Sequence, residues 1–564
     1  MFLLECLAIS TFLLGSLAHI QGDAVHVLNH FLALGHAGTC ATSFLSDSDS
    51  INHEWRSRLK SQKHSAQRLL KGGAPFADEH LGISVPPPPL EIVPLIVSGP
   101  SSNRVDLVFF SDGYTPEERD KFVADALRLA EDVSTNQTFN TVQPLLNFWA
   151  AFSPSNESGL GNNGPNDTPF GLYRINTELR GVYYAYAEVG RAACDSLGNQ
   201  CDYPILLGND PLYGGLGGEF TVVTASIING PLVLRHELGH SILDVGEEYD
   251  GGQAYFGRNS ARDPANIPWT QWLSDPSRAN PDGTPRIERS VMPMQAYPWT
   301  LLNTTKAWAV QFDSSGLYER YLLQFSLSGI PDKEDLRVEF DGTDLEWEPR
   351  EDLGADRWFY DFLGDKKLEA GKHKLKFTLL NGALEGKAQL CSTEVLEYGN
   401  EEEFVLEPGF YSLYPTYSNL NRTTYRPTND DCLMRSVITP NFCKVCIETL
   451  WIKLLQHVSF VDSIQETCEL QADSAALKVL DLVLLPLADL RQRAIAAKES
   501  YTIIWQKDGV VLEDFTNKTR IAVDEAGALG TYNIHVKFST EEVRISDSPT
   551  LENNISYEVK TGCN

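Results

Sequence analysis

Five consecutive residues near the middle of this 564-residue chain constrain it most, because positions 236–240 read His-Glu-Leu-Gly-His. Two histidines four residues apart lie on one face of a helix, about 6 Å apart along its axis, so both imidazoles can reach one zinc ion. Glu237 would then lie beside the metal, where it can accept a proton from a metal-activated water and pass it to a leaving amine. The pattern predicts a zinc site with His236 and His240 as ligands and Glu237 as general base. A helix that merely exposes two histidines and a glutamate is the plainer alternative.

The flanking sequence predicts a strand, a helix and a turn around this motif. Residues 220–228 are rich in β-branched side chains, which is typical of a buried strand. Pro231 suits the first turn of a helix, which we expect over residues 232–245. Gly246 can adopt the left-handed conformation that ends many helices. The chain can therefore turn back toward the metal just after the helix.

A catalytic zinc ion needs a third protein ligand, and three acidic residues follow the motif closely. Asp244 lies a full helical turn beyond His240, so its carboxylate should miss an ion that both histidines hold. Glu247 and Glu248 follow the turn at Gly246, and their side chains are expected to face opposite ways. Only one of them can then bind zinc, and the residues alone leave that choice open. An acidic loop in solvent is the alternative for both.

Several segments resemble the IgA-peptidase-type zinc metallopeptidases, which are metzincin-like. The run at 236–252, HELGHSILDVGEEYDGG, resembles the zinc signature of that family. Residues 105–114 and 206–218 resemble its opening strand and its glycine-rich segment, and residues 425–446 resemble its C-terminal signature. The glycine-rich segment is expected to offer backbone groups to an extended peptide substrate by strand addition.

The resemblance implies Zn²⁺ as cofactor, and it carries functional roles onto four residues of this chain. The implied metal ligands are His236, His240 and Glu247, and the implied base is Glu237. Metzincins usually have a glycine three residues after the second histidine and a ligand six residues after it, whereas Leu243 and Gly246 stand at those places here. They also keep a methionine in a tight turn beneath the metal, for which we expect Met434 rather than Met292.

The N-terminus and the glycosylation sites predict an exported protein. Residues 1–18 are apolar, with Ser16 and Ala18 placed as at a signal-peptide cleavage site, although Glu5 and the lack of a basic start are unusual. Asparagines in the glycosylation pattern Asn-x-Ser/Thr occur at Asn136, Asn156, Asn166, Asn303, Asn421, Asn517 and Asn554. We therefore expect a secreted, extracellular glycoprotein without stable membrane association.

The ten cysteines fit an oxidising compartment. Cys194 and Cys201 bracket a short polar loop, and we expect a disulfide between them. A second group of cysteines lies near the C-terminal family segment, and its C-x-x-C pair would suit metal or redox chemistry in a cytosolic protein. In an exported chain we expect disulfides instead for Cys432, Cys443, Cys446 and Cys468.

The net charge of −30 and the pI of about 4.8 exclude nucleic acid and anionic membranes as expected partners, because both require a basic surface. Along the chain, Thr115-Pro116-Glu117-Glu118 is a capping box that predicts a helix over residues 116–132. Short alternating runs over residues 311–400 and in the last hundred residues are typical of β-sandwiches.

The predicted fold is α+β and multi-domain, with a metzincin-like zinc peptidase domain, an inserted β-sandwich and a C-terminal immunoglobulin-like β-sandwich. The expected order is a signal peptide at 1–18, a leader or propeptide with a Pro-rich linker at 19–100, the catalytic domain at 101–310 and 401–459, the inserted sandwich at 311–400 and the last sandwich at 460–564.

Two functions from different classes fit these predictions. The first is a secreted zinc-dependent endopeptidase that acts on protein or peptide substrates. The second is a secreted glycan- or protein-binding module with a non-catalytic zinc site. The complete set of His236, Glu237 and His240 favours the first.

Overall fold

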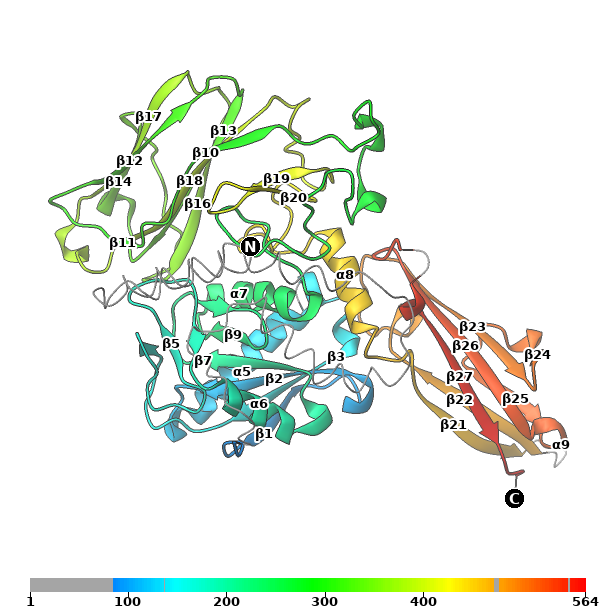
Figure 1. The fold of residues 1–564 in the computed structure, drawn as a ribbon. Helices are drawn as coiled ribbons and strands as arrows, with labels where there is room; N and C mark the ends of the chain where they lie inside the picture. Colours follow the sequence, from blue (N-terminus) through cyan, green and yellow to red (C-terminus); the bar gives the residue numbers. More distant parts are fainter. Residues whose placement is uncertain (1–84, 136, 471–475, 546–547, 564) are drawn as a thin grey trace, which may run out of the picture. The chain divides into compact units, whose positions relative to one another are not determined.

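A six-stranded mixed sheet organises the part of the chain that contains the motif (Figure 1). The computed structural model describes residues 85–563 except 136, 471–475 and 546–547, so the predicted signal peptide and most of the predicted leader lie outside the described residues. The strand order is β1-β3-β2-β7-β9-β8. The bounds are β1 Glu91–Ile96, β2 Val105–Asp112, β3 Leu146–Phe152, β7 Tyr203–Gly208, β8 Gly215–Leu216 and β9 Thr221–Thr224.

The central strands of this sheet are parallel, and the two outer strands, β1 and β8, are antiparallel to their neighbours. Every residue of β2 is buried, as expected for a parallel strand that is covered on both faces. β9 lies in the first half of the strand predicted over residues 220–228, and residues 225–228 are not part of it. A small sheet beside it contains β4 Gly161–Asn162, β5 Leu172–Arg174 and β6 Tyr183–Tyr184.

Helix α5, Arg119–Thr135, confirms the helix predicted from the capping box. The Thr115 side chain accepts from the backbone of Glu118, and the Glu118 side chain accepts from the backbone N–H of Thr115. The buried apolar residues of α5 recur with the period of a helix, at Phe122, Ala126, Leu129, Ala130 and Val133. The other α-helices of the described residues are α6 Ala187–Ser196, α7 Asn229–Leu238, α8 Lys444–Leu454 and the short α9 Glu525–Ala528.

Two β-sheets that enclose a separate apolar core follow the motif. The first sheet has the order β10-β18-β13-β16, with β11 also paired to β18, and the second has the order β12-β17-β14-β15. The bounds are β10 Ser290–Ala296, β11 Thr300–Leu301, β12 Trp308–Ser314, β13 Arg320–Ser328, β14 Leu336–Phe340, β15 Thr343–Asp344, β16 Arg357–Gly364, β17 Gly371–Leu379 and β18 Gln389–Tyr398.

These strands begin before residue 311, where the sequence placed the start of the insertion. That position lies inside β12, and both β10 and β11 already pair with β18. The register of β10 shifts between Val291 and Met294, around Pro293, and proline cannot donate to a ladder. Strict alternation, the signal used to find strands, is therefore absent from β10.

After these sheets the chain returns to the motif. β19 Tyr414–Tyr417 and β20 Thr423–Arg426 form a hairpin, and a loop over residues 427–443 leads into α8. Cys432, Leu433 and Met434 in this loop are fully buried. Helix α8, Lys444–Leu454, begins directly after this loop.

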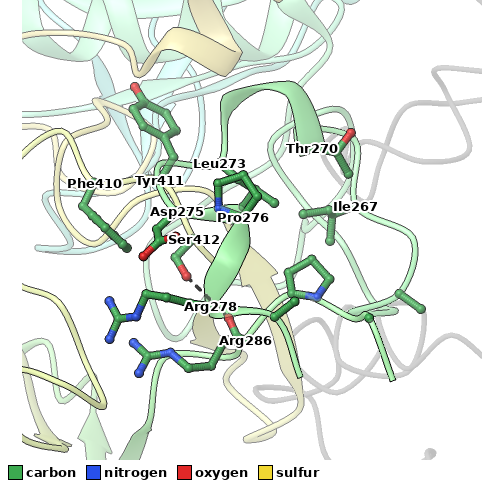
Figure 2. A pocket seen from close by; sticks show the side chains of 14 residues that line it. Ile267, Thr270, Leu273, Asp275, Pro276, Arg278, Arg286, Phe410, Tyr411 and Ser412 are labelled. Carbon is green, nitrogen blue, oxygen red and sulfur yellow. Dashed lines mark hydrogen bonds between the residues drawn. The ribbon is translucent and has the colours of Figure 1, made fainter. Parts of the chain in front are cut away.

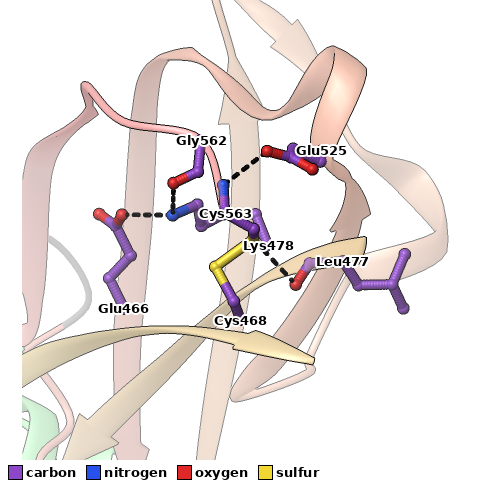
Figure 3. Close-up of a disulfide and its surroundings, with 7 residues drawn as sticks. All are labelled: Glu466, Cys468, Leu477, Lys478, Glu525, Gly562 and Cys563. Atoms are coloured by element: carbon purple, nitrogen blue, oxygen red, sulfur yellow. Dashed lines mark hydrogen bonds and ion pairs between the residues drawn. A yellow bond between two sulfur atoms is a disulfide. The ribbon is translucent and has the colours of Figure 1, made fainter. Parts of the chain in front are cut away.

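The C-terminal part contains two further sheets, with orders β21-β22-β25 and β24-β23-β26-β27. The bounds are β21 Val461–Leu470, β22 Ala476–Leu484, β23 Glu499–Lys507, β24 Val510–Val511, β25 Arg520–Asp524, β26 Gly530–Thr540 and β27 Glu552–Val559. A disulfide between Cys468 and Cys563 joins β21 to the segment after β27 (Figure 3). Among the described residues, no helix combines the length and the apolar character that a membrane span needs.

The cysteines outside this disulfide divide into two groups. The predicted disulfide between Cys194 and Cys201 is confirmed. The disulfide prediction is wrong for Cys432, Cys443 and Cys446, which are buried and carry free thiols. Residues 425–446 thus contain three cysteines that form no disulfide within the described residues.

Candidate active site

The motif spans the junction between two kinds of helix. His236 lies in the last turn of α7, and His240 lies in a single π-helical turn, Gly239–Leu243, that continues it. The helix therefore ends before residue 245, the end that the sequence predicted. Asp244 takes the left-handed conformation, with φ 58° and ψ 44°, which aspartate tolerates better than most residues.

Gly246 is needed for a different reason from the one predicted. Its N–H donates to Phe256 O at 2.8 Å. A Cβ atom at this position would lie 2.3 Å from Ala254 O and 2.5 Å from Phe256 N. The glycine therefore allows close approach of two backbones, while Asp244 makes the turn.

The turn brings Glu247 onto both motif histidines. Glu247 Oε2 lies 3.2 Å from His236 Nε2, and Glu247 Oε1 lies 3.1 Å from His240 Nε2. One ligand atom from each of the three side chains lies within 4.8 Å of the others. Two imidazole nitrogens and a carboxylate, which all accept hydrogen bonds, can converge this closely only around a cation, either a shared proton or a metal ion.

The remaining ring nitrogens set the orientation of the two imidazoles. His236 Nδ1 lies 3.0 Å from Leu433 O, and His240 Nδ1 lies 2.8 Å from Val245 O. A carbonyl can only accept, so each Nδ1 carries a proton. The Nε2 lone pairs therefore point into the space shared with Glu247, which is the arrangement that metal-binding histidines use.

Charge and burial shift the titration of all these groups. Burial alone would lower the pKa of His240, but Glu247 and Glu237 raise it to about 9. Burial works against ionisation of Glu247, yet the two histidines hold its pKa far below the usual range. Burial raises the pKa of Glu237, against the influence of His236 and His240. A raised pKa suits a carboxylate that accepts a proton and later returns it.

Two glycines make room for the Glu237 side chain. A Cβ at Gly215 would lie 3.0 Å from Glu237 Oε1, and one at Gly217 would lie 2.9 Å from Glu237 Oε2. The glycine-rich segment therefore runs past the base with bare backbone.

Strand β8 ends the sheet, yet part of its outer edge is already paired. Gly215 N donates to Arg180 O at 3.2 Å, and Val182 N donates to Gly215 O at 3.3 Å. The paired part of this edge ends at Gly215.

The sequence did not point to three further polar side chains near the motif. The Tyr249 ring lies 6.3 Å from the His236 ring, and its hydroxyl is hydrogen-bonded to Arg180. Burial and the charge of Glu237 raise the pKa of Tyr213 to about 12, against the opposing charges of Arg357 and Arg180. Tyr249 follows the two glutamates directly and could have been found, whereas Arg180 and Tyr213 carry no local signal, since only the fold brings them here.

Met434 packs against the segment that contains the motif. A Cβ at Gly239 would lie 2.6 Å from Met434 Sδ, and Met434 O accepts from Glu248 N at 2.9 Å. Met292 lies in β10 and packs in a different apolar cluster. The loop that contains Met434 also supplies Leu433 O, the acceptor for His236.

A cavity of about 310 Å³ lies elsewhere in the chain (Figure 2). Ile267, Phe410, Tyr411 and the side chains of Arg278 and Arg286 line it. None of the motif residues belongs to this lining. The cavity is therefore distinct from the candidate active site.

Comparison with solved structures adds no fold assignment. A ruminal GH26 endo-beta-1,4-mannanase is 16% identical over 26% of each chain with a TM-score of 0.13, so this chain spans about a quarter of that protein. A beta-glycosidase from Bacteroides vulgatus is 11% identical, over 45% of this chain and 25% of that chain, with a TM-score of 0.11. Among curated proteins, none matches the chain.

The sequence model of the family described as IgA Peptidase M64 matches residues 93–293. The matched residues contain the six-stranded sheet except for the first two residues of β1, and they contain all three side chains that converge at the motif. The match confirms the resemblance to the IgA-peptidase-type zinc metallopeptidases over these residues, and it supports a peptide hydrolase of the metallopeptidase class.

Proposed function

We propose that the protein is a secreted zinc-dependent endopeptidase, with His236, His240 and Glu247 as zinc ligands and Glu237 as general base. The convergence of the two Nε2 atoms on one carboxylate, at 3.2 and 3.1 Å, carries this proposal. Two histidines and one carboxylate form a ligand set typical of catalytic zinc, which keeps one position open. Two disulfides in the described residues fit export.

Bound zinc would polarise the scissile carbonyl and lower the pKa of the attacking water toward about 7. The chain itself supplies the remaining parts of the reaction. Leu433 O and Val245 O hold the two imidazoles in the tautomer that faces the metal. Glu237 takes the proton of the water and gives it to the amine that leaves.

Substrate binding would use the backbone at the end of β8. An extended peptide can pair with residues 216–218 by strand addition, because the edge before them is already paired to Arg180 and Val182. This position runs alongside Glu237, whose carboxylate faces Gly217. Arg180 and Tyr249 offer hydrogen-bond donors beside Glu247.

The position of Met434 beneath α7 supports a metzincin-like arrangement within this proposal. The two C-terminal sheets support a β-sandwich, for which the immunoglobulin-like type remains our proposal.

The Glu237→Gln variant tests the proposal. It should retain zinc, because Glu237 is not a ligand, and lose about 10²–10⁴-fold in cleavage rate because the proton acceptor is gone. Activity is measured by mass spectrometry of a random peptide library, with and without a zinc chelator. Glu188→Gln changes an exposed residue of α6 and serves as the matched control. Cleavage by Glu237→Gln at the wild-type rate would contradict the role of this residue.

A further inference from the structure

Glu248 points away from the histidines that Glu247 faces, into a group of three buried thiols. We propose that Cys432, Cys443, Cys446 and Glu248 form a second, structural zinc site. One ligand atom from each of these four side chains lies within 4.8 Å of the others. This site shares no residue with the candidate active site, and it does not depend on the proposed catalysis.

The spacing of the sulfur atoms fits a shared ion. Cys432 Sγ and Cys446 Sγ lie 3.8 Å apart, and Cys446 Sγ lies 3.8 Å from Glu248 Oε1. Zinc–sulfur bonds are about 2.3 Å long, so two thiolates at tetrahedral corners lie about 3.8 Å apart. The sulfur atoms of Cys432 and Cys446 are thus as far apart as two ligands of one zinc ion. The sulfur atoms of Cys194–Cys201 and of Cys468–Cys563, by contrast, are joined as disulfides.

The burial of the carboxylate provides an independent observation. Glu248 is fully buried, and its Oε1 accepts from Asn259 Nδ2 at 2.9 Å. Its Oε2 is also buried and has no hydrogen-bond partner among the described residues. The nearby guanidinium of Arg426 donates to Asn429 O and Pro415 O instead. A carboxylate oxygen buried without a partner is costly, and a cation held by the thiols would satisfy it.

The spacing of two of the cysteines at the start of α8 is also typical of a zinc site. Cys443 caps the N-terminus of α8 and Cys446 lies in its first turn, which is the C-x-x-C spacing of many zinc ligands. The N–H of Cys443 donates to Cys432 Sγ at 3.4 Å, a contact that favours a thiolate. The positive end of the α8 dipole also favours negative sulfur atoms here.

The second ion would hold the active-site ligands in position. It would join the segment of Glu247 and Glu248 to the loop of residues 427–443, which provides Leu433 O for His236 and places Met434 beneath α7. The contact between Glu248 N and Met434 O, 2.9 Å long, already links the same two segments. We therefore assign the thiol site a positioning role.

Metal analysis of the full chain separates the two sites. In a His236→Ala/His240→Ala double variant, native mass spectrometry should find one zinc ion per chain, because the thiol site stays intact. If the thiol site does not exist, the double variant contains no zinc. If the catalytic proposal fails instead, the wild type and the double variant contain the same single ion.

Cobalt substitution identifies the ligands of the remaining ion. Co²⁺ in the double variant should show the sulfur-to-metal absorption that a site of histidine and glutamate lacks. Cys446→Ser should abolish this absorption, while Cys391→Ser, which alters a buried free thiol in β18, should retain it. Absence of the band from the Co²⁺-loaded double variant would overturn the site.

Thiol mapping of the unmodified protein covers the case in which the cysteine variants fail to fold. After denaturation with a chelator and alkylation, mass spectrometry should find Cys432, Cys443 and Cys446 alkylated. A disulfide between any two of them would overturn the proposal.

Discussion

One carboxylate joins the two histidines of the candidate active site. Because Glu247 presents Oε1 to His240 and Oε2 to His236, it contacts each imidazole with a separate oxygen. Neither histidine contributes its Nδ1, which a backbone carbonyl already occupies. Removal of this one side chain would therefore leave only two ligand atoms facing the shared space.

The Glu247→Ala variant should lose zinc affinity. Loss of an outer partner of a zinc ligand costs about 10–100-fold in affinity, so loss of a direct ligand should cost more than about 100-fold. Affinity is measured by competition with a chromogenic chelator. Asp244→Asn is the matched control, since it is near in sequence and half-exposed, and asparagine also tolerates the left-handed conformation. Equal affinities of the two variants would remove Glu247 from the ligand set.

At the residue scale, the sequence predicts groups of side chains that are close together in the chain. It does not predict groups that only the folded chain brings together. Helical period places His236 and His240 together, and opposite orientation of Glu247 and Glu248 follows from an extended chain. The thiol cluster could not be found this way, because Cys432 and Glu248 are 184 positions apart in the sequence. Because the sequence indicates export to an oxidising compartment, it predicts disulfides for Cys432, Cys443 and Cys446, whose thiols are free in the structure.

Among the elements, the end of the motif helix differs most from its prediction. The π-helical turn shortens the helix, and Asp244, not Gly246, takes the positive φ. A sequence can show that a glycine ends a periodic segment, yet it cannot show whether that glycine turns the chain or admits another backbone. Helix α5 was predictable because its capping box is local, and β10 was not because Pro293 interrupts its alternation.

Substitutions at these two positions should have opposite effects on stability. Gly246→Ala forces a methyl group against the backbone at Ala254 and Phe256, and overpacking of this kind costs about 1–3 kcal/mol. The left-handed conformation costs an L-residue about 1–2 kcal/mol, and glycine avoids this cost. Asp244→Gly should therefore leave the stability unchanged or increase it. Thermal unfolding followed by calorimetry measures both. A lower Tm for Asp244→Gly than for Gly246→Ala would contradict the assignment of the turn.

On the scale of the whole molecule, a buried ion pair links the first strands to the C-terminal sheets. Arg104, next to β2, donates to Asp462 in β21 at 2.6 and 2.9 Å, and Asn103 donates to the same carboxylate at 2.7 Å. The Arg104 side chain is 2% exposed and that of Asp462 is 15% exposed. One continuous apolar core also contains residues of both parts.

This ion pair should make the link sensitive to acid. Partial burial would raise the pKa of Asp462, but hydrogen bonds from Arg104 and Asn103 outweigh it and hold the pKa below its usual value. A depressed pKa contributes stability that is present above the unfolded value, about 3.9 for aspartate, and is lost as the pH falls through the folded value. Asp462→Asn should cost about 3 kcal/mol at neutral pH because it leaves Arg104 buried and unpaired.

Calorimetry at neutral pH and at about pH 3 tests this effect. The difference in free energy of unfolding between wild type and Asp462→Asn should be smaller in acid. Asp481→Asn removes an exposed pair with Arg520 and is the control, with an expected cost of about 0–1 kcal/mol. A difference that stays constant with pH would show that the charge of Asp462 does not stabilise the link.

The adjacent glutamates limit how this chain can change over generations. Glu247 and Glu248 serve opposite sides of one short segment, so the segment between Asp244 and Glu247 cannot change length. Deleting one residue there would present Glu248 to the histidines and leave the thiols without a carboxylate. Inserting one residue there would instead present Glu247 to the thiols and leave the histidines without a carboxylate. Any descendant of this sequence that keeps both clusters must therefore keep the same number of residues from His240 to Glu248.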